Sequence, residues 1–205
     1  MLVIVDYDAG NLRSVTRAVE HAGGAPLISA DPQVVRQARA VILPGVGSAA
    51  QAMERLRQLG LDQALREVAN QGVPILGVCL GLQVLLEHSE EGGVTGTDCL
   101  GLLPGTVRRF APGPKVPHMG WNTVTLRQPS PLFDEIADQS YFYFVHSYYG
   151  DPPLDTVIGQ TDYPTPFCSV MAREAIVATQ FHPEKSGPAG LRVYANFLRL
   201  AGLCS

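Results

Sequence analysis

Short apolar runs alternate with amphipathic stretches over the first ninety residues of the chain. The runs are rich in β-branched residues and lie at 2–5, 26–29, 40–43 and 74–78. Alternation of this kind is typical of strand–helix units that build a parallel sheet. The pattern therefore predicts four buried strands in this half.

Apolar positions at helical spacing mark the segments between these runs. The first such segment begins at Asn11, a good N-cap residue, and ends at the pair Gly23 and Gly24. A short helix is predicted after Asp31, where Pro32 suits a first turn, and one or two helices are predicted before Asn70.

The pattern changes from about Val94 onward. Many short β-type runs follow, separated by Pro and Gly, and an amphipathic helix over 191–200 closes the chain. No linker or internal repeat separates the two halves. We therefore predict a single domain, 1–205, of the α/β class: a three-layer, flavodoxin-like, mostly parallel central sheet with helices on both faces and a strand-rich second half.

Composition narrows the class of protein. Hydrophobic residues make up 46% and charged residues 17%, which argues against a disordered chain. The net charge is −4 and the basic residues are scattered, so no nucleic-acid partner is expected. Neither a signal peptide nor an apolar stretch long enough for a bilayer is present, so we expect a cytoplasmic protein that does not bind a membrane.

The cysteines are the first candidates for chemistry. Four of them are widely spaced, without a CxxC pair or a histidine at metal-ligand spacing, so neither a disulfide framework nor a metal site is expected. Cys79 stands apart, because Gly77 and Gly81 flank it where an apolar run passes into a helical pattern. This arrangement is typical of a nucleophile elbow, and a thiol at a helix N-terminus favours the reactive thiolate. A buried core cysteine is the alternative for this residue.

A thiol nucleophile needs a base, and His182 is the best candidate of the five histidines. It follows an apolar strand in the run His182-Pro183-Glu184, where Glu184 is close enough to orient the imidazole. An ordinary turn at a strand end is the alternative. A third element is the loop Leu43-Pro44-Gly45-Val46-Gly47, whose glycines allow close backbone approach to a ligand.

The ordered set PGVG, GVCLGLQ and FHPEKS resembles the class I glutamine amidotransferases, and the resemblance spans most of the chain. It implies a triad of Cys79, His182 and Glu184, with oxyanion donors from Leu80 and from the segment Val46 and Gly47. It also implies glutamine as the substrate and no cofactor. The substrate contacts implied by the resemblance are Gln83, Glu91, His146, Ser147 and Tyr148.

Three further stretches resemble the glutaminase subunits of imidazole glycerol phosphate synthases: DYDAGNLRSV, PHMGWN and YFVHSYY. One departure is Asp8, where these subunits more often have glycine. The resemblance implies a heterodimer with a (βα)8-barrel cyclase that receives the ammonia in histidine biosynthesis. Candidate contact residues for this partner are Asn11, Arg17, His118, Met119, Trp121 and Lys185.

Three alternatives remain at this stage. The first is a γ-glutamyl hydrolase or peptidase on the same scaffold, and the second is the glutaminase of pyridoxal phosphate synthesis. The third is a binding module without activity. The carboxylate of Glu184 favours an amidotransferase, and PHMGWN favours the histidine pathway.

Overall fold

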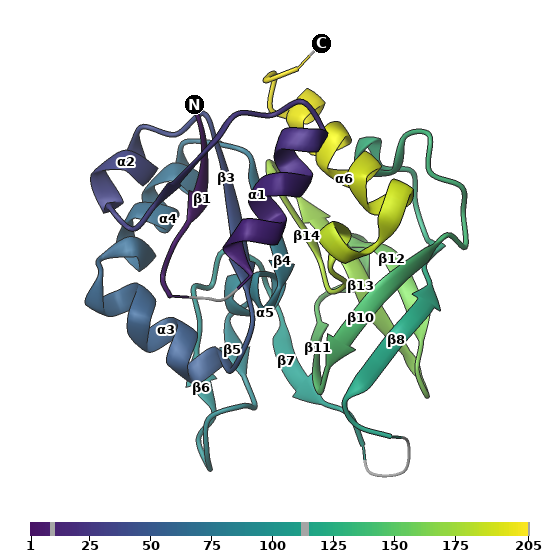
Figure 1. The fold of residues 1–205 in the computed structure, drawn as a ribbon. Coiled ribbons are helices and arrows are strands. Elements are labelled where there is room, and N and C mark those ends of the chain that lie inside the picture. The colour runs from purple at the N-terminus through teal and green to yellow at the C-terminus, as the bar shows by residue number, and fades with distance from the viewer. Residues whose placement is uncertain (9–10, 112–114, 205) are drawn as a thin grey trace.

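The N-terminal half consists of strand–helix units, as the sequence predicts (Figure 1). The computed structural model describes residues 1–8, 11–111 and 115–204. The strands of this half are β1 (Leu2–Val5), β2 (Pro26–Ser29), β3 (Ala40–Gly45) and β4 (Ile75–Cys79). Its helices are α1 (Leu12–His21), α2 (Pro32–Arg36), α3 (Ala49–Gln58), α4 (Leu61–Asn70) and α5 (Leu80–Leu85).

The second half is mostly strand and ends in a long helix. Its strands are β5 (His88–Ser89), β6 (Thr97–Asp98), β7 (Thr106–Arg109), β8 (His118–Thr123), β9 (Thr125–Leu126), β10 (Tyr141–His146), β11 (Tyr148–Asp151), β12 (Val157–Asp162), β13 (Pro166–Arg173) and β14 (Ile176–Thr179). Three short 3-10 turns are η1 (Pro131–Phe133), η2 (Leu154–Thr156) and η3 (Pro183–Lys185). The last helix is α6 (Gly187–Leu200), which begins earlier than predicted because Pro188 fits its first turn.

One large sheet joins the two halves. Its strand order is β2-β1-β3-β4-β14-β13-β11-β7-β5-β6, with β12 beside β13 and β9 beside β12. The strands from β2 to β14 are parallel, and those beyond β14 are antiparallel except for the pair β5 and β7. The predicted α/β fold, with a sheet that is parallel around its centre and a strand-rich second half, is confirmed.

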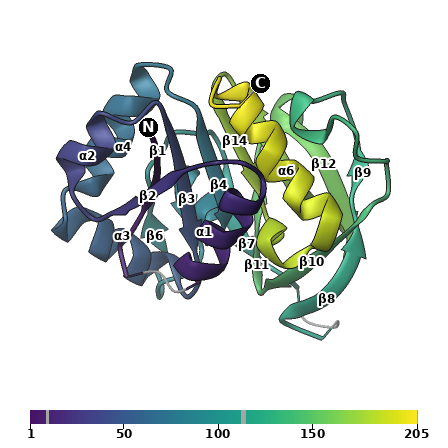
Figure 2. The same cartoon turned by 45° about the horizontal axis from the view of Figure 1, so that its top comes forward.

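Helices cover both faces of this sheet. Successive residues of β1 alternate between the two layers: Val3 and Val5 pack with α2 to α5, and Leu2 and Ile4 pack with α1 and α6. Figures 1 and 2 both show α1 and α6 side by side on the same face. No helix among the described residues is long and apolar enough to cross a membrane.

One pair of strands lies apart from the large sheet. Strands β8 and β10 form a separate antiparallel pair, in which His146 lies opposite His118. The side chains of Phe142 and Phe144 point from β10 into the core, where Phe142 stacks on Phe181 and Phe144 meets the same ring edge-on. The pair therefore adds a layer above the large sheet instead of extending its edge.

Candidate active site

The backbone at Cys79 has the strained conformation expected of a nucleophile elbow. Its φ of 56° and ψ of −108° lie in a region that non-glycine residues rarely occupy. Strand β4 ends at this residue and helix α5 begins at the next one, Leu80. The thiol therefore lies at the N-terminus of a helix, where unpaired N–H groups are available to an anion.

The glycines around Cys79 are required by close backbone packing. A Cβ on Gly81 would lie 1.8 Å from the carbonyl oxygen of Leu43, and one on Gly77 would lie 3.0 Å from the carbonyl carbon of Gly81. A Cβ on Gly45 would lie 2.9 Å from the Cβ of Leu80. The elbow and the end of β3 therefore touch through their backbones, as the glycine pattern predicts.

His182 and Glu184 form a buried pair. The Nδ1 atom of His182 is 2.8 Å from Oε1 of Glu184, and both side chains are almost fully buried. The main chain of His182 is fixed at both ends, because its N–H donates to Tyr143 and its carbonyl accepts from the Ser186 hydroxyl. Its Nε2 atom lies free of hydrogen bonds among the described residues.

The charges around His182 favour the imidazolium form. Burial lowers its pKa, but the nearby sulfur of Cys79, followed by the carboxylate of Glu184, raises the pKa to about 10. A proton on His182 at neutral pH is then available to a leaving group.

Glu184 has three donors around its carboxylate. Oε1 also accepts from the side-chain amide of Asn11, and Oε2 accepts from the hydroxyl of Tyr194. Asn11 precedes α1 in a left-handed conformation, with φ of 78°, and its side chain does not cap that helix. Asn11 is therefore the N-cap residue, as predicted, but its side chain contacts Glu184 instead of capping the helix.

The loop after β3 lies against the elbow. Tyr7 donates a hydrogen bond of 2.8 Å to the carbonyl of Pro44, and burial, followed by the charge of Cys79, raises the pKa of Tyr7. Gly47 has φ of 97°, a conformation that favours glycine. Val46 and Gly47 line the same cavity as Cys79 and Leu80.

This cavity has a volume of about 280 Å³, and the predicted substrate contacts line it together with Cys79 and His182. They are Gln83, Glu91, His146, Ser147 and Tyr148. Gln83 already makes hydrogen bonds within the protein. Its amide nitrogen donates to the carbonyl of Tyr148 and to the side-chain oxygen of Gln180, so only its own oxygen is free for a substrate.

His146 does not have a free side chain either. Its Nδ1 lies 2.8 Å from the carbonyl of Tyr148, and its Nε2 lies 3.0 Å from Nδ1 of His118. Both ring nitrogens of His146 therefore have partners, and its backbone is the part that stays available to a substrate. One oxygen of Glu91 accepts from the N–H of Ala49 at the start of α3, which leaves the other oxygen for a ligand.

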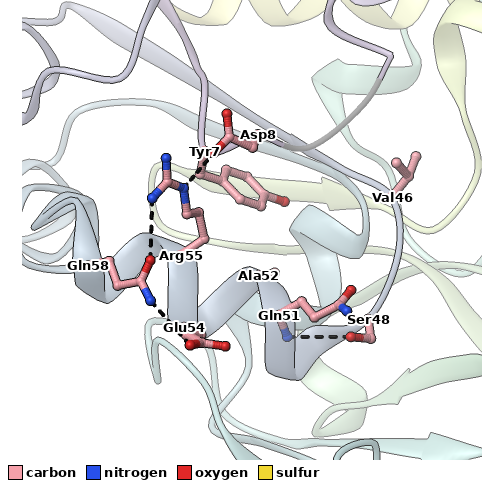
Figure 3. A pocket seen from close by; sticks show the side chains of 9 residues that line it. All are labelled: Tyr7, Asp8, Val46, Ser48, Gln51, Ala52, Glu54, Arg55 and Gln58. Atoms are coloured by element: carbon pink, nitrogen blue, oxygen red, sulfur yellow. Dashed lines mark hydrogen bonds and ion pairs between the residues drawn. The ribbon is translucent and has the colours of Figure 1, made fainter.

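A second cavity, of about 330 Å³, lies beside the loop and against α3 (Figure 3). Arg55 on α3 pairs there with Asp8, whose φ is 65°. Asp8 thus adopts the backbone that glycine favours, which accounts for the more common glycine at this position. Ala9 and Gly10 of the DYDAGNLRSV motif lie outside the described residues.

The candidate partner contacts divide between the surface and the core. Arg17, Met119, Trp121 and Lys185 are exposed, and Asn11 is half-buried. His118 is only 4% exposed, because alternate residues of β8 point inward, and its ring stacks on Tyr163. The prediction of His118 as a surface contact is therefore wrong.

The other cysteines do not share the environment of Cys79. Burial raises the pKa of Cys99 to about 11 and the pKa of Cys168 to about 12, so both stay as thiols at neutral pH. Cys204 is half-buried near Gly23 at the far end of the molecule.

The sequence did not identify three residues of the site: Tyr7, Gln180 and Tyr194. Gln180 is fully buried, and its amide nitrogen lies 3.8 Å from the sulfur of Cys79. Its position two residues before His182, at the end of a strand, was a signal that both side chains share one face.

Known proteins are similar to this chain over nearly its whole length. The family model for "Glutamine amidotransferase class-I" matches residues 3–201. The chain is 48% identical, over 98% of each chain, to "Imidazole glycerol phosphate synthase subunit HisH" of Dehalococcoides mccartyi. It is also 48% identical to the protein of the same name from Methanothermobacter thermautotrophicus, again over 98% of each chain.

Solved structures show the same fold at low sequence identity. One, titled "Crystal structure of glutamine amidotransferase", has a TM-score of 0.77 at 20% identity and covers 98% of each chain. A second, a Trypanosoma brucei "CTPS - glutaminase domain with bound acivicin", has a TM-score of 0.70 at 15% identity and covers 100% of this chain and 94% of its own.

Proposed function

The chain belongs to the class I glutamine amidotransferase family, and we propose from this premise that it is the glutaminase subunit of an imidazole glycerol phosphate synthase. It hydrolyses L-glutamine to L-glutamate and ammonia for histidine biosynthesis. One observation carries the proposal: a strained cysteine, a glycine loop and an imidazole that is paired with a buried carboxylate line a single cavity, in a chain close to half identical to such subunits.

The proposed reaction uses Cys79, His182 and Glu184 as a triad. The Cys79 thiolate attacks the side-chain carboxamide carbon of glutamine and forms a carbon–sulfur bond. As the carbon–nitrogen bond breaks, His182 gives its proton to the leaving ammonia, and Glu184 holds the imidazole in place. Water, deprotonated by the same imidazole, then cleaves the thioester and releases glutamate.

We assign the oxyanion donors to the backbone of Leu80 and of the segment Val46 and Gly47. The N–H of Leu80 belongs to the first turn of α5, where it has no intrahelical partner. Removal of one such donor typically costs about 3 kcal/mol of transition-state stabilisation. We further assign the free oxygens of Gln83 and Glu91 to the substrate ammonium, and the backbone of His146, Ser147 and Tyr148 to the carboxylate.

The ammonia requires a partner subunit. Ammonia released into water at neutral pH is mostly protonated and loses its nucleophilic electron pair, so a sealed route to the acceptor is needed. We propose that 1–205 is one amidotransferase domain and that a (βα)8-barrel cyclase docks on it to form a cytoplasmic heterodimer.

The outward face of β8 and β10 is the proposed centre of this interface. Met119 is 61% exposed, Trp121 is 55% exposed and Tyr141 is 62% exposed. The ring of Trp121 packs edge-on against Tyr143, and the ammonium of Lys185 lies 5.7 Å from the centre of that same ring. We call these five residues the β8–β10 patch. Aromatic and Met side chains of this kind are typical of interface cores. Arg17 and the half-buried Asn11 would lie at its margin.

The test is a glutaminase assay on the complex with the cyclase and its ligand. Cys79→Ala should lower glutamate release at least 1,000-fold, on the order of what loss of a nucleophile costs. Cys204→Ala, a matched change outside the cavity, should retain activity. Glutamate release by the Cys79→Ala complex would refute the mechanism. Faster cleavage of γ-glutamyl peptides than of glutamine would favour a γ-glutamyl hydrolase instead.

A further inference from the structure

The amide of Gln180 lies directly beside the sulfur of Cys79. Strands β4 and β14 pair in parallel with Thr179 opposite Val78, so the next residue on each strand is Gln180 and Cys79. The Gln180 side chain is completely buried, with its Nε2 atom 3.8 Å from the sulfur and its Oε1 atom 3.1 Å from Nε2 of Gln83. A buried amide in this position is a fixed dipole next to the nucleophile.

The orientation of this amide follows from a backbone group that can only accept. The carbonyl of Tyr148 lies 2.9 Å from one end of the Gln83 amide, and that end must be the NH₂ group. The same NH₂ group faces Gln180, so Gln180 must turn its carbonyl oxygen towards Gln83. The Gln180 NH₂ group is then left to point at the sulfur, and it donates a hydrogen bond to it.

A second chain of hydrogen bonds reaches the carbonyl of Tyr148. Nδ1 of His146 donates to Tyr148, which leaves Nε2 of His146 to accept from Nδ1 of His118. Burial lowers the pKa of His146 to about 3 and of His118 to about 4, so both rings are neutral at physiological pH. The carbonyl of Tyr148 is therefore held by two donors, and it forms a rigid anchor for the Gln83 amide.

We propose that Gln180 is a positioning residue for the nucleophile: its amide, oriented by Gln83, holds the Cys79 sulfur and stabilises the thiolate. The proposal rests on Cys79 being the nucleophile. A donated N–H favours the charged form of an acceptor, and the effect is large where water is excluded. A neutral amide offers this without a second positive charge, which would lower the pKa of His182.

The test is the pH dependence of Cys79 alkylation in the complex. Iodoacetamide reacts with the thiolate, so the ratio of the rate at about pH 6 to the rate at about pH 9 reports how far the thiolate is favoured. Mass spectrometry of the peptide that contains Cys79 separates it from Cys204. The other titratable groups around the sulfur, His182, Tyr7, Glu91, His146 and Tyr148, are the same in each variant.

Gln180→Met keeps the length of the side chain and removes the donor. The ratio of the alkylation rate at about pH 6 to that at about pH 9 should fall about tenfold. Less of Cys79 is then thiolate at the lower pH, whereas the rate at the higher pH is retained. Loss of packing alone would change both rates together. A ratio equal to that of the wild type would overturn the proposal.

Gln83→Met is a second variant that does not touch the sulfur. It frees the Gln180 amide to rotate, so the ratio should fall by a smaller factor, about threefold. An unchanged ratio here also counts against the proposal, even where Gln180→Met does not fold. The glutaminase assay of Cys79→Ala is independent: activity in that variant defeats the proposed function, whereas unchanged ratios with an inactive Cys79→Ala defeat only the role of Gln180.

Discussion

The conformation of Cys79 is imposed by its neighbours. A left-handed φ at a cysteine costs on the order of 1–3 kcal/mol, and it persists because two strands and a helix meet there. Gly81 is the tightest of these contacts, since its α-carbon faces the carbonyl of Leu43. The strain aims the thiol into the cavity instead of into the core.

Gly81→Ala should therefore disrupt the elbow. The added methyl meets a backbone oxygen at 1.8 Å, so β3 and α5 must separate, and the free energy of unfolding should fall by about 3 kcal/mol or more. Gly150→Ala is the matched control, because its methyl meets only the flexible ends of Leu82 and Leu86 at 3.1 Å. It should cost about 1 kcal/mol. Equal losses in urea unfolding of the two variants would contradict this account.

The sequence predicted the residues to which we assign the chemistry, but not the residues that contact and orient them. Cys79 and the pair His182 and Glu184 have local motifs, and glycines announce the close packing. Gln180 and Tyr194 have none, because a buried amide or hydroxyl acquires its partner only through tertiary contact. The contact of Asn11 with Glu184 was missed for the same reason: the sequence identifies Asn11 as an N-cap residue but does not show which group its side chain contacts.

At the level of elements, β8 and β10 form a ribbon with two different faces. Residues that point outward are exposed and aromatic or apolar, and those that point inward include His118 and His146. The alternation is visible in the sequence of each strand, and it predicts two faces. It does not predict which strands pair, so the separation of this ribbon from the large sheet required the structure.

The two inward histidines should make the ribbon sensitive to acid. The folded pKa of His118, about 4, lies below the value near 6.5 of an unfolded histidine. Above about pH 6.5 both states are neutral and nothing is lost. As the pH falls from there towards 4, only the unfolded state binds the proton, so stability declines.

His118→Gln keeps a donor for His146 but does not titrate. Between pH 7 and pH 5 the wild type should lose about 2 kcal/mol more of its unfolding free energy than this variant does. The variant starts from a lower stability at pH 7, because the stack on Tyr163 is lost, so the comparison is between changes with pH. Parallel losses in denaturant titrations at the two pH values would show that His118 is not the sensitive group.

On the scale of the whole molecule, the position of β14 beside β4 brings the residues of the candidate active site together. The first four strands follow one another in sequence, and β14 then enters beside β4 from the far end of the chain. His182 and Glu184 thereby reach Cys79. This arrangement follows from the sequence only through the family resemblance, since a long-range strand pairing leaves no local pattern.

The same arrangement places the β8–β10 patch close to the site. Tyr143 carries Lys185 over its outward face, and its carbonyl accepts from the N–H of His182. A partner that covers the patch would therefore contact residues adjacent in the chain to the triad candidates. Its binding energy should be concentrated in the large rings.

Trp121→Ala should weaken the complex with the cyclase by about 2 kcal/mol, a loss of roughly 30-fold in affinity, because a half-exposed indole at the centre of such a patch is typical of a hot spot. Lys185→Ala should reduce partner-stimulated glutaminase activity more than it reduces affinity, since Lys185 links the patch to the chain beside Glu184. Leu27→Ala is the matched control: Leu27 is 45% exposed on the edge strand β2, outside the patch. Calorimetric titration of each variant, paired with the activity assay, separates the two effects. Wild-type affinity and stimulation in both variants would mean that the cyclase docks on a different face.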